Sequence, residues 1–167
     1  MTTAQTTYCK TPIGIAKIIG DKNGVQEVSI IDDDIISREK LPMDTPECLQ
    51  ECVSQLKEYF KGERASFNLI VNPKGTSFQV KVWKELLKIP YGKTTSYLEQ
   101  SKALGDVKAL RAVASANGKN PLWIIIPCHR VIGSDGSLTG YAGGIWRKKW
   151  LLAHENPVKQ QSLFLKI

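Results

Sequence analysis

Residues 96–117 read SYLEQSKALGDVKALRAVASAN, a pattern of two short helices. Ser96 stands three residues before a glutamate, as in a capping box, which predicts a helix over 97–104. Gly105 ends that helix, and a second helix is expected over 107–117. Two short helices joined by a tight, glycine-containing turn are typical of a helix-turn-helix.

The second of these helices carries mostly small side chains. Arg111 is the exception, and its long side chain should project beyond its neighbours. Small residues let a helix backbone approach another surface closely, and that surface can be nucleic acid or the protein's own interior. The small residues are Ala109, Ala112, Ala114, Ser115 and Ala116.

The charge of the chain changes sign at Pro73-Lys74-Gly75, which we interpret as a linker between two domains. Residues 1–74 hold nine Lys or Arg and eleven Asp or Glu, a net charge of −2. Residues 75–167 carry a net charge of +9 within the total of +7. A strongly basic half indicates a polyanionic partner, although a solvated lysine-rich surface would give the same count.

The first domain is rich in β-branched residues and contains Asn23-Gly24, a signal for a hairpin turn. A later segment has apolar residues at helical spacing and stops at Gly62. We therefore expect an antiparallel sheet with a helix, formed by strands over 8–19, 25–31 and 66–71 and a helix over 46–61.

On either side of the helix-turn-helix, the second domain shows further periodic segments. Thr76 and Gln79 can form a capping box at the start of a helix. The run LWIII is wholly apolar and must be buried. We expect helices over 77–88 and 145–155, a buried segment over 122–126, and a small hairpin, or wing, over 131–138.

Composition excludes several classes of protein. The apolar content of 42% allows a folded core, and no run reaches the ~18 apolar residues of a membrane span. The polar N-terminus lacks a secretory signal, so we expect no membrane association and a cytoplasmic location, or a nuclear one in a eukaryote. The cysteines Cys9, Cys48, Cys52 and Cys128 are then expected to be free thiols.

Cys128 is the first candidate for chemistry, because His129 and Arg130 follow it directly. A thiol is mostly protonated at neutral pH, so a nucleophilic cysteine needs a base or a positive charge beside it. Glu155 could orient His129 as in a catalytic triad, whereas His154 is a competing candidate base. The residues alone leave both assignments open, together with a purely structural role for a buried cysteine.

Residues 126–131, Ile-Pro-Cys-His-Arg-Val, resemble the active-site hexapeptide of the methylated-DNA–protein-cysteine methyltransferases, also called 6-O-alkylguanine-DNA alkyltransferases. The resemblance is dense over residues 75–156 and loose over 1–74, where it consists mainly of strand-strand-helix organisation. Other segments resemble the family in the same order: Thr94-Thr95-Ser96-Tyr97, Arg111-Ala112-Val113, Gly118-Lys119-Asn120-Pro121, Gly140-Tyr141-Ala142-Gly143-Gly144 and Trp150-Leu151-Leu152-Ala153-His154-Glu155.

The resemblance implies a catalytic set. Cys128 would accept the alkyl group, His129 would act as base through a bound water, and Glu155 would orient His129. Asn120 would help to hold the active-site turn. Tyr97 would give its phenolic proton to the departing guanine. The product is a stable thioether, so each molecule would react once.

The resemblance also implies where the substrate binds. The damaged nucleotide would rotate out of double-stranded DNA, approached through the minor groove, and Arg111 would fill the gap that it leaves. The base pocket is expected to include Val131, Tyr141, Ala142 and Gly143. The expected DNA-binding residues are Arg111, Thr94, Thr95, Ala109, Ala112, Ser115, Ala116 and Arg130.

The fold implied is α+β: a small ribonuclease H-like domain over 1–74, with an antiparallel sheet and a helix, followed by a winged helix-turn-helix alkyltransferase domain over 75–167. We expect a monomer without a cofactor. Some relatives hold zinc in the first domain, but no histidine precedes His129 here, so no metal site is expected. The resemblance gives no account of Trp123, which we expect in the core.

Three alternatives remain at this point. A lesion-binding protein of the same fold would carry tryptophan in place of the acceptor cysteine, whereas this chain has Cys128. A cysteine hydrolase would turn over repeatedly and would not need a basic half. A winged-helix transcription regulator would perform no chemistry.

Overall fold

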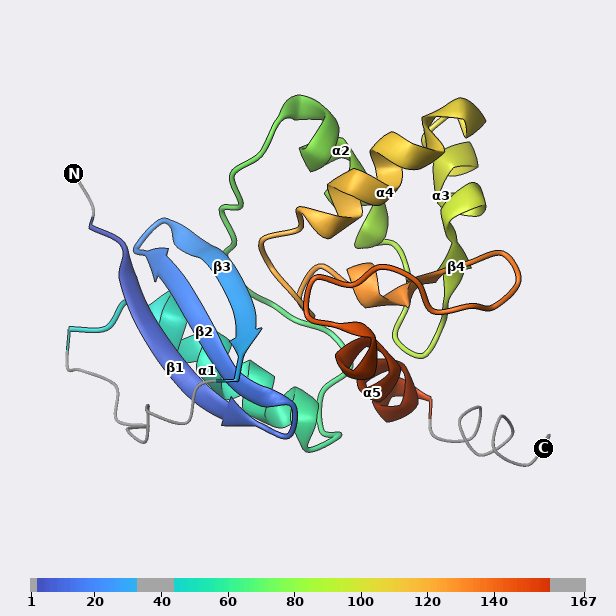
Figure 1. Ribbon diagram of the computed structural model, residues 1–167. Helices are drawn as coiled ribbons and strands as arrows, with labels where there is room; N and C mark the ends of the chain where they lie inside the picture. Colours follow the sequence, from blue (N-terminus) through green and yellow to red (C-terminus); the bar gives the residue numbers. More distant parts are fainter. Residues whose placement is uncertain (1–2, 33–43, 157–167) are drawn as a thin grey trace. The chain divides into compact units, whose positions relative to one another are not determined.

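The computed structural model describes residues 3–32 and 44–156 of the chain (Figure 1). It divides into two compact units, Met1–Lys74 with Pro121–Ile125, and Gly75–Asn120 with Ile126–Ile167. The segment Pro121–Ile125 thus belongs to the first unit, whereas the division made from the sequence placed it in the second domain. The reason is backbone pairing, because Val28 donates to the carbonyl of Pro121 at 2.8 Å.

The first unit is built on a three-stranded antiparallel sheet. Its strands are β1 (Gln5–Thr11), β2 (Gly14–Asp21) and β3 (Gly24–Ile31), in the order β1-β2-β3. Helix α1 (Glu47–Phe60) packs against this sheet and contributes buried Leu49, Cys52, Val53 and Leu56 to the core (Figure 1). The expected sheet-plus-helix organisation is confirmed.

Two expected strands of this unit differ in the structure. The single strand expected over 8–19 is two strands, because the chain reverses between Thr11 and Gly14. The hydroxyl of Thr11 accepts from the amide of Ile13 at 3.1 Å and donates to the carbonyl of Gly14 at 2.7 Å, which fixes the turn. The β-branched residues on both sides of the reversal concealed it in the sequence.

The strand expected over 66–71 is wrong apart from an isolated bridge between Val25 and Val71. The side chain of Gln55 takes the place of a neighbouring strand. It accepts from the amide of Asn68 and donates to the carbonyl of the same residue, each at 2.9 Å. Trp123, expected in the core, is only partly buried, and its amide donates to the carbonyl of Val28.

The second unit contains the helix-turn-helix. Helix α2 (Ser77–Leu86) begins at the predicted capping box, with both of its hydrogen bonds present. Helix α3 (Tyr97–Ala103) is followed by the 3-10 turn η1 (Val107–Ala109) and helix α4 (Leu110–Gly118). The side chains of Gln100 and Asn117 exchange two hydrogen bonds of 2.8 Å, which join α3 to α4.

The wing takes a different form from the expected hairpin. Strand β5 (Val131–Ile132) pairs in parallel with β4 (Thr95–Ser96), the segment just before α3. The chain then turns through a bond of 2.8 Å from the amide of Gly133 to the carbonyl of Ser137, without a returning strand over 133–138. This pairing places the 3-10 turn η2 (Cys128–Arg130), which precedes β5, beside the start of α3.

Helix α5 (Ile145–Glu155) completes the second unit and has the predicted bounds. The α+β class, with a sheet domain followed by a helical one, is confirmed. Among the described residues, no helix has both the length and the apolar character needed to cross a membrane.

Candidate active site

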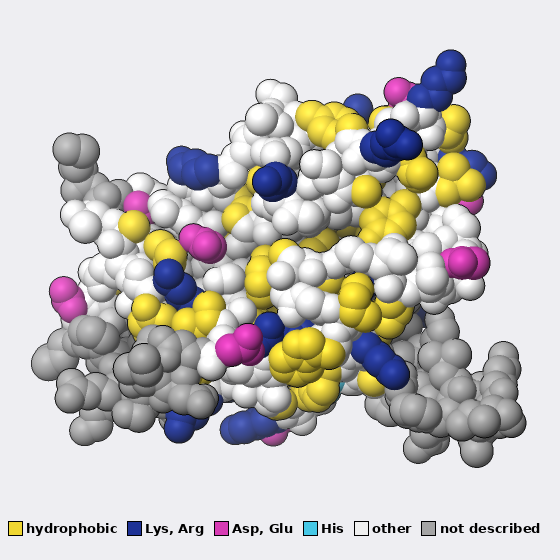
Figure 2. Space-filling model, viewed as in Figure 1, with side chains coloured by type: hydrophobic (Ala, Val, Ile, Leu, Met, Phe, Trp, Pro, Cys, Tyr) yellow, Lys and Arg dark blue, Asp and Glu magenta, His cyan; other side chains and the backbone are white. Residues whose placement is uncertain are grey.

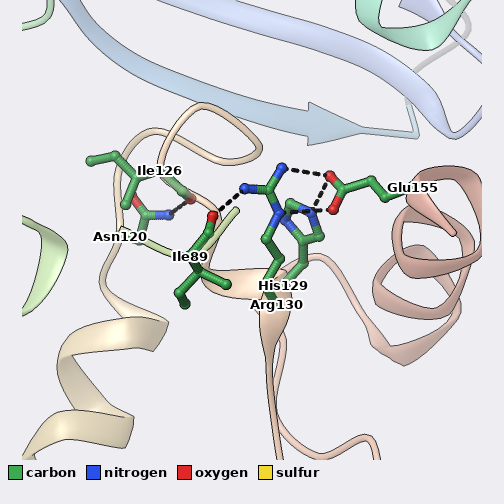
Figure 3. Close-up of polar contacts among 6 residues, drawn as sticks. All are labelled: Ile89, Asn120, Ile126, His129, Arg130 and Glu155. Carbon is green, nitrogen blue, oxygen red and sulfur yellow. Dashed lines mark hydrogen bonds and ion pairs between the residues drawn. The ribbon is translucent and has the colours of Figure 1, made fainter. Parts of the chain in front are cut away.

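Cys128 opens the turn η2 and is 9% exposed. Asn120 holds the segment just before this turn, because its side-chain amide donates to the carbonyl of Ile126 at 2.8 Å (Figure 3). Burial raises the pKa of the Cys128 thiol, while a hydrogen bond from Asn120 and the charge of Lys148 act in the opposite direction. The thiol therefore needs a base to become nucleophilic.

His129, the residue after Cys128, forms a buried pair with Glu155, which we call the relay. Nε2 of His129 lies 2.7 Å from Oε2 of Glu155, a residue at the end of α5 (Figure 3). A carboxylate accepts hydrogen bonds, so Nε2 carries the proton and Nδ1 keeps its lone pair. Nδ1 is buried and has no hydrogen-bond partner within the described part of the chain.

The electrostatics of the relay favour a neutral imidazole. Burial lowers the pKa of His129, and it outweighs the hydrogen bond and charge of Glu155, which act to raise that pKa. Burial alone would raise the pKa of Glu155, but the hydrogen bonds and charges of His129 and Arg130 hold it well below its usual range. At neutral pH, the His129 imidazole is thus neutral and the Glu155 carboxyl is ionised.

His154, the competing candidate base, lies elsewhere. Its ring stacks on Trp150 of the same helix, with centroids 4.9 Å apart. Of the two histidines that the sequence could not separate, His129 is the one that contacts Glu155.

A cavity of about 390 Å³ lies in front of Cys128. Its wall includes Tyr97 at the start of α3 and Arg111 on α4, together with Tyr141 and Ala142 from the loop before α5. A thiol in the wall of a cavity of this size can meet a reactive group on a bound molecule.

Tyr97 has a buried partner that the sequence did not single out. Its hydroxyl donates to the carbonyl of Thr139 at 2.8 Å, and Nζ of Lys148 lies 3.3 Å from the same hydroxyl. Lys148 is fully buried, and burial lowers its pKa to about 8. The missed signal was its spacing on α5, because Lys148 shares a helix face with Leu151 and Glu155.

Two residues expected in the base pocket do not reach the cavity wall. Val131 is fully buried in β5. Gly143 is also buried, and its carbonyl accepts from the guanidinium of Arg147 at 3.0 Å. Neither residue belongs to the lining, which on this side consists of residues 139–142.

The residues expected at DNA fall into two groups. Arg111, Ala112 and Ser115 are exposed on α4, while Thr94, Thr95 and Ala109 are partly exposed. Ala116 faces inward, and its carbonyl accepts from the indole of Trp83 at 2.9 Å, so close packing within the unit explains this small residue. Figure 2 shows Lys and Arg side chains over the helix-turn-helix elements on the face in view.

Arg130 was expected on the DNA-binding surface, and the structure corrects this. The residue is only 6% exposed, and its guanidinium forms an ion pair with Glu155 at 2.8 Å. A side chain buried in this way cannot also contact a phosphate. Among the described residues, no group of three His, Cys, Asp or Glu side chains could hold a metal ion.

The second unit thus combines a helix-turn-helix with a cavity that reaches Cys128, beside a buried His129–Glu155 pair, which is the arrangement of a DNA-binding domain with a candidate nucleophile. Comparison with known families makes this class specific. Residues 77–157 match the DNA-binding domain of 6-O-methylguanine DNA methyltransferase, and residues 5–73 match its ribonuclease-like domain. The chain belongs to the 6-O-methylguanine DNA methyltransferase family.

Similar proteins support this membership along most of the chain. A methylated-DNA–protein-cysteine methyltransferase of Methanosarcina barkeri is 44% identical over 149 residues, covering 87% of this chain and 93% of the relative. The crystal structure of Mycobacterium tuberculosis O6-methylguanine methyltransferase is 40% identical, with a TM-score of 0.79 and coverage of 93% and 94%. Mycobacterium tuberculosis OGT in complex with DNA is 41% identical, with a TM-score of 0.80 and coverage of 91% and 92%.

Proposed function

We propose that this protein repairs DNA by moving an alkyl group from the 6-oxygen of guanine to Sγ of Cys128, once and irreversibly. The observation that carries the proposal is the position of Cys128, which lines a cavity and directly precedes the buried His129–Glu155 pair. Family membership and the DNA-bound relative support the same reaction. Thymine alkylated on its 4-oxygen is a second possible donor of the alkyl group.

The first step is activation of the thiol. The lone pair on Nδ1 of His129 takes the proton of Cys128 through a bound water, and Glu155 stabilises the imidazolium that forms. The thiolate then attacks the alkyl carbon, so the S–C bond forms as the C–O bond breaks, and the electron pair stays on guanine. A proton donor at the base would keep guanine from leaving as an anion.

Tyr97 is the proposed proton donor. It lines the cavity, and its hydroxyl is fixed by the carbonyl of Thr139 and by Lys148. The Lys148 ammonium would stabilise the phenolate left behind after the proton moves. Tyr141 and Ala142 would hold the base against the wall that faces Tyr97.

DNA would bind through the exposed face of α4. The small side chains Ala112 and Ser115 permit close approach to the minor groove, while Arg111 at the cavity rim would replace the everted nucleotide. The net charge of +9 on residues 75–167 would add affinity without reading sequence. A single chain supplies every group that the proposed reaction needs, so we infer a monomer. Its four free thiols fit a reducing compartment such as the cytoplasm.

Stoichiometry tests the proposal. Duplex DNA carrying labelled 6-O-methylguanine should transfer about one label to each protein molecule and then stop. Repeated turnover would indicate a hydrolase, and tight binding without transfer would indicate a lesion sensor. Cys128→Ser should abolish transfer and leave DNA binding nearly intact, because the thiol is a reacting group rather than a phosphate contact.

A further inference from the structure

Arg130 contacts Glu155 through two hydrogen bonds, and its guanidinium has further partners beside the relay. Nε donates to Oε1 of Glu155 at 2.8 Å, and a terminal nitrogen donates to Oε2 at 3.0 Å (Figure 3). The other terminal nitrogen donates to the carbonyl of Ile89 at 2.7 Å. The guanidinium carbon also lies 5.7 Å from the ring centroid of Tyr91. A two-point fork of this kind fixes the carboxylate plane as well as its charge.

Glu155 is therefore shared between two donors. Its Oε2 accepts from both His129 and Arg130, and only 1% of its side chain is exposed. A carboxylate buried to this extent with the imidazole as its single partner could rotate, or could take up the proton of the imidazolium. The fork of Arg130 opposes both, because it is satisfied only by an ionised carboxylate in this orientation.

The charges around His129 act in opposite directions. Glu155 favours the imidazolium, whereas Arg130 and Lys148 disfavour it. The thiol of Cys128 adjoins the ring in the chain, and the phenol groups of Tyr91 and Tyr141 interact with the same carboxylate. Arg130 is the one among these groups that contacts Glu155 through two hydrogen bonds.

We propose that Arg130 is a positioning residue of the proposed transfer reaction: by fixing and neutralising the Glu155 carboxylate, it keeps His129 uncharged with Nδ1 available as the base. This inference rests on the proposed function for its catalytic consequence. Its physical consequence, the protonation of His129, can be measured without any DNA.

Two variants separate the charge of Arg130 from its geometry. Arg130→Lys keeps the positive charge but loses the two-point hydrogen bonding, so the pKa of His129 should stay near that of the wild type. The transfer rate should fall about tenfold, which is part of the ~10²–10⁴-fold that a positioned base contributes. Arg130→Met removes both, so the rate should fall further and the pKa of His129 should rise on the order of one unit.

The chain suits a direct measurement because it contains only two histidines. Titration of isotope-labelled imidazoles by NMR would follow His129, with His154 as an internal reference. The matched control is Lys149→Met, which removes an exposed cation from α5 and should leave the His129 titration unchanged. Transfer rates would be measured across pH with free 6-O-benzylguanine, which removes DNA binding from the comparison.

An unchanged His129 titration in Arg130→Met would overturn the inference, as would a wild-type rate in Arg130→Lys. If Arg130→Met does not fold, the rate of Arg130→Lys decides the matter, because that variant leaves Glu155 with a cationic partner. A wild-type protein that fails to transfer the alkyl group would sink the proposed function and would leave the NMR result standing.

Discussion

Oε2 of Glu155 lies 2.7 Å from Nε2 of His129, and both side chains are almost wholly buried. Twenty-five residues separate the two in the sequence, and helix α5 brings them together. Because a carboxylate accepts hydrogen bonds, the contact places the proton on Nε2 and leaves the lone pair on Nδ1. Several measurable consequences depend on this arrangement.

The acidic side of the pH–rate profile reports on His129. Burial lowers the pKa of this imidazole, so the neutral base is present above that lowered pKa and is lost as pH falls through it. As pH falls from neutral, the single-turnover rate with free 6-O-benzylguanine should therefore stay level down to about pH 6.5, the usual pKa of histidine, and should decline only below that pH. A decline centred above pH 6.5 would contradict a base held neutral by its surroundings.

Replacing Glu155 should destabilise the fold as well as slow the reaction. Glu155→Gln leaves the buried Arg130 without its anionic partner, a change that costs about 3–5 kcal/mol in comparable pairs. Urea unfolding would measure it. The pKa of Glu155 is depressed in the folded protein, so its charge stabilises the wild type fully above about pH 4.3. The difference in unfolding free energy between the wild type and Glu155→Gln should therefore be largest above that pH and should shrink as pH falls below it.

Glu99→Gln is the matched control for this effect. Glu99 also pairs with a cation, at 3.3 Å from Lys102, but both side chains are more than half exposed. Its removal should cost less than about 1 kcal/mol. If Glu155→Gln and Glu99→Gln lose the same unfolding free energy, burial does not strengthen the Glu155 ion pair, and the prediction is wrong.

The alkaline side of the profile should report on Lys148. Burial lowers its pKa to about 8, so its positive charge is lost as pH rises through that value. If the ammonium supports Tyr97 as proton donor, the wild-type rate should decline above about pH 8, and Lys148→Met should be slower and lack this decline. The same alkaline limb in Lys148→Met and in the wild type would remove Lys148 from the account.

Arg111 should matter only in duplex DNA. Arg111→Ala removes the side chain proposed to replace the everted nucleotide, so repair of duplex DNA should slow about tenfold or more, given an unstacking cost of a few kcal/mol. Reaction with free 6-O-benzylguanine should be nearly unchanged, although Arg111 lies at the rim of the cavity. Parallel losses on the two substrates would count against a role in base eversion.

Local signals in the sequence were sufficient for much of the second unit. The capping box at Thr76 and the cap at Ser96 predicted the helix starts, because a cap involves residues close together in the chain. The resemblance to a known family supplied the catalytic set. The reversal between Thr11 and Gly14 was missed because the β-branched residues on both sides looked like one continuous strand.

The errors at the site have a common physical cause. Arg130 was interpreted as a surface cation and Lys148 was not considered, because charged side chains are seldom buried and a sequence does not show the partners that permit it. The partner of Arg130 is Glu155, 25 positions further along the chain. Lys148 contacts the hydroxyl of Tyr97, 51 positions away, and the carbonyls of Thr139 and Gly140 in the loop before α5. Only the folded chain reveals that Arg130 contacts Glu155 and that Lys148 contacts Tyr97.

Peptide mass spectrometry after reaction with DNA containing 6-O-methylguanine tests the central claim most directly. The mass of one methyl group should appear on the peptide that contains Cys128, at about one equivalent per protein molecule. Cys9, Cys48 and Cys52 serve as internal controls and should remain unmodified. A methyl group on any of these three thiols, or an unmodified Cys128 after the lesion has been repaired, would contradict the account.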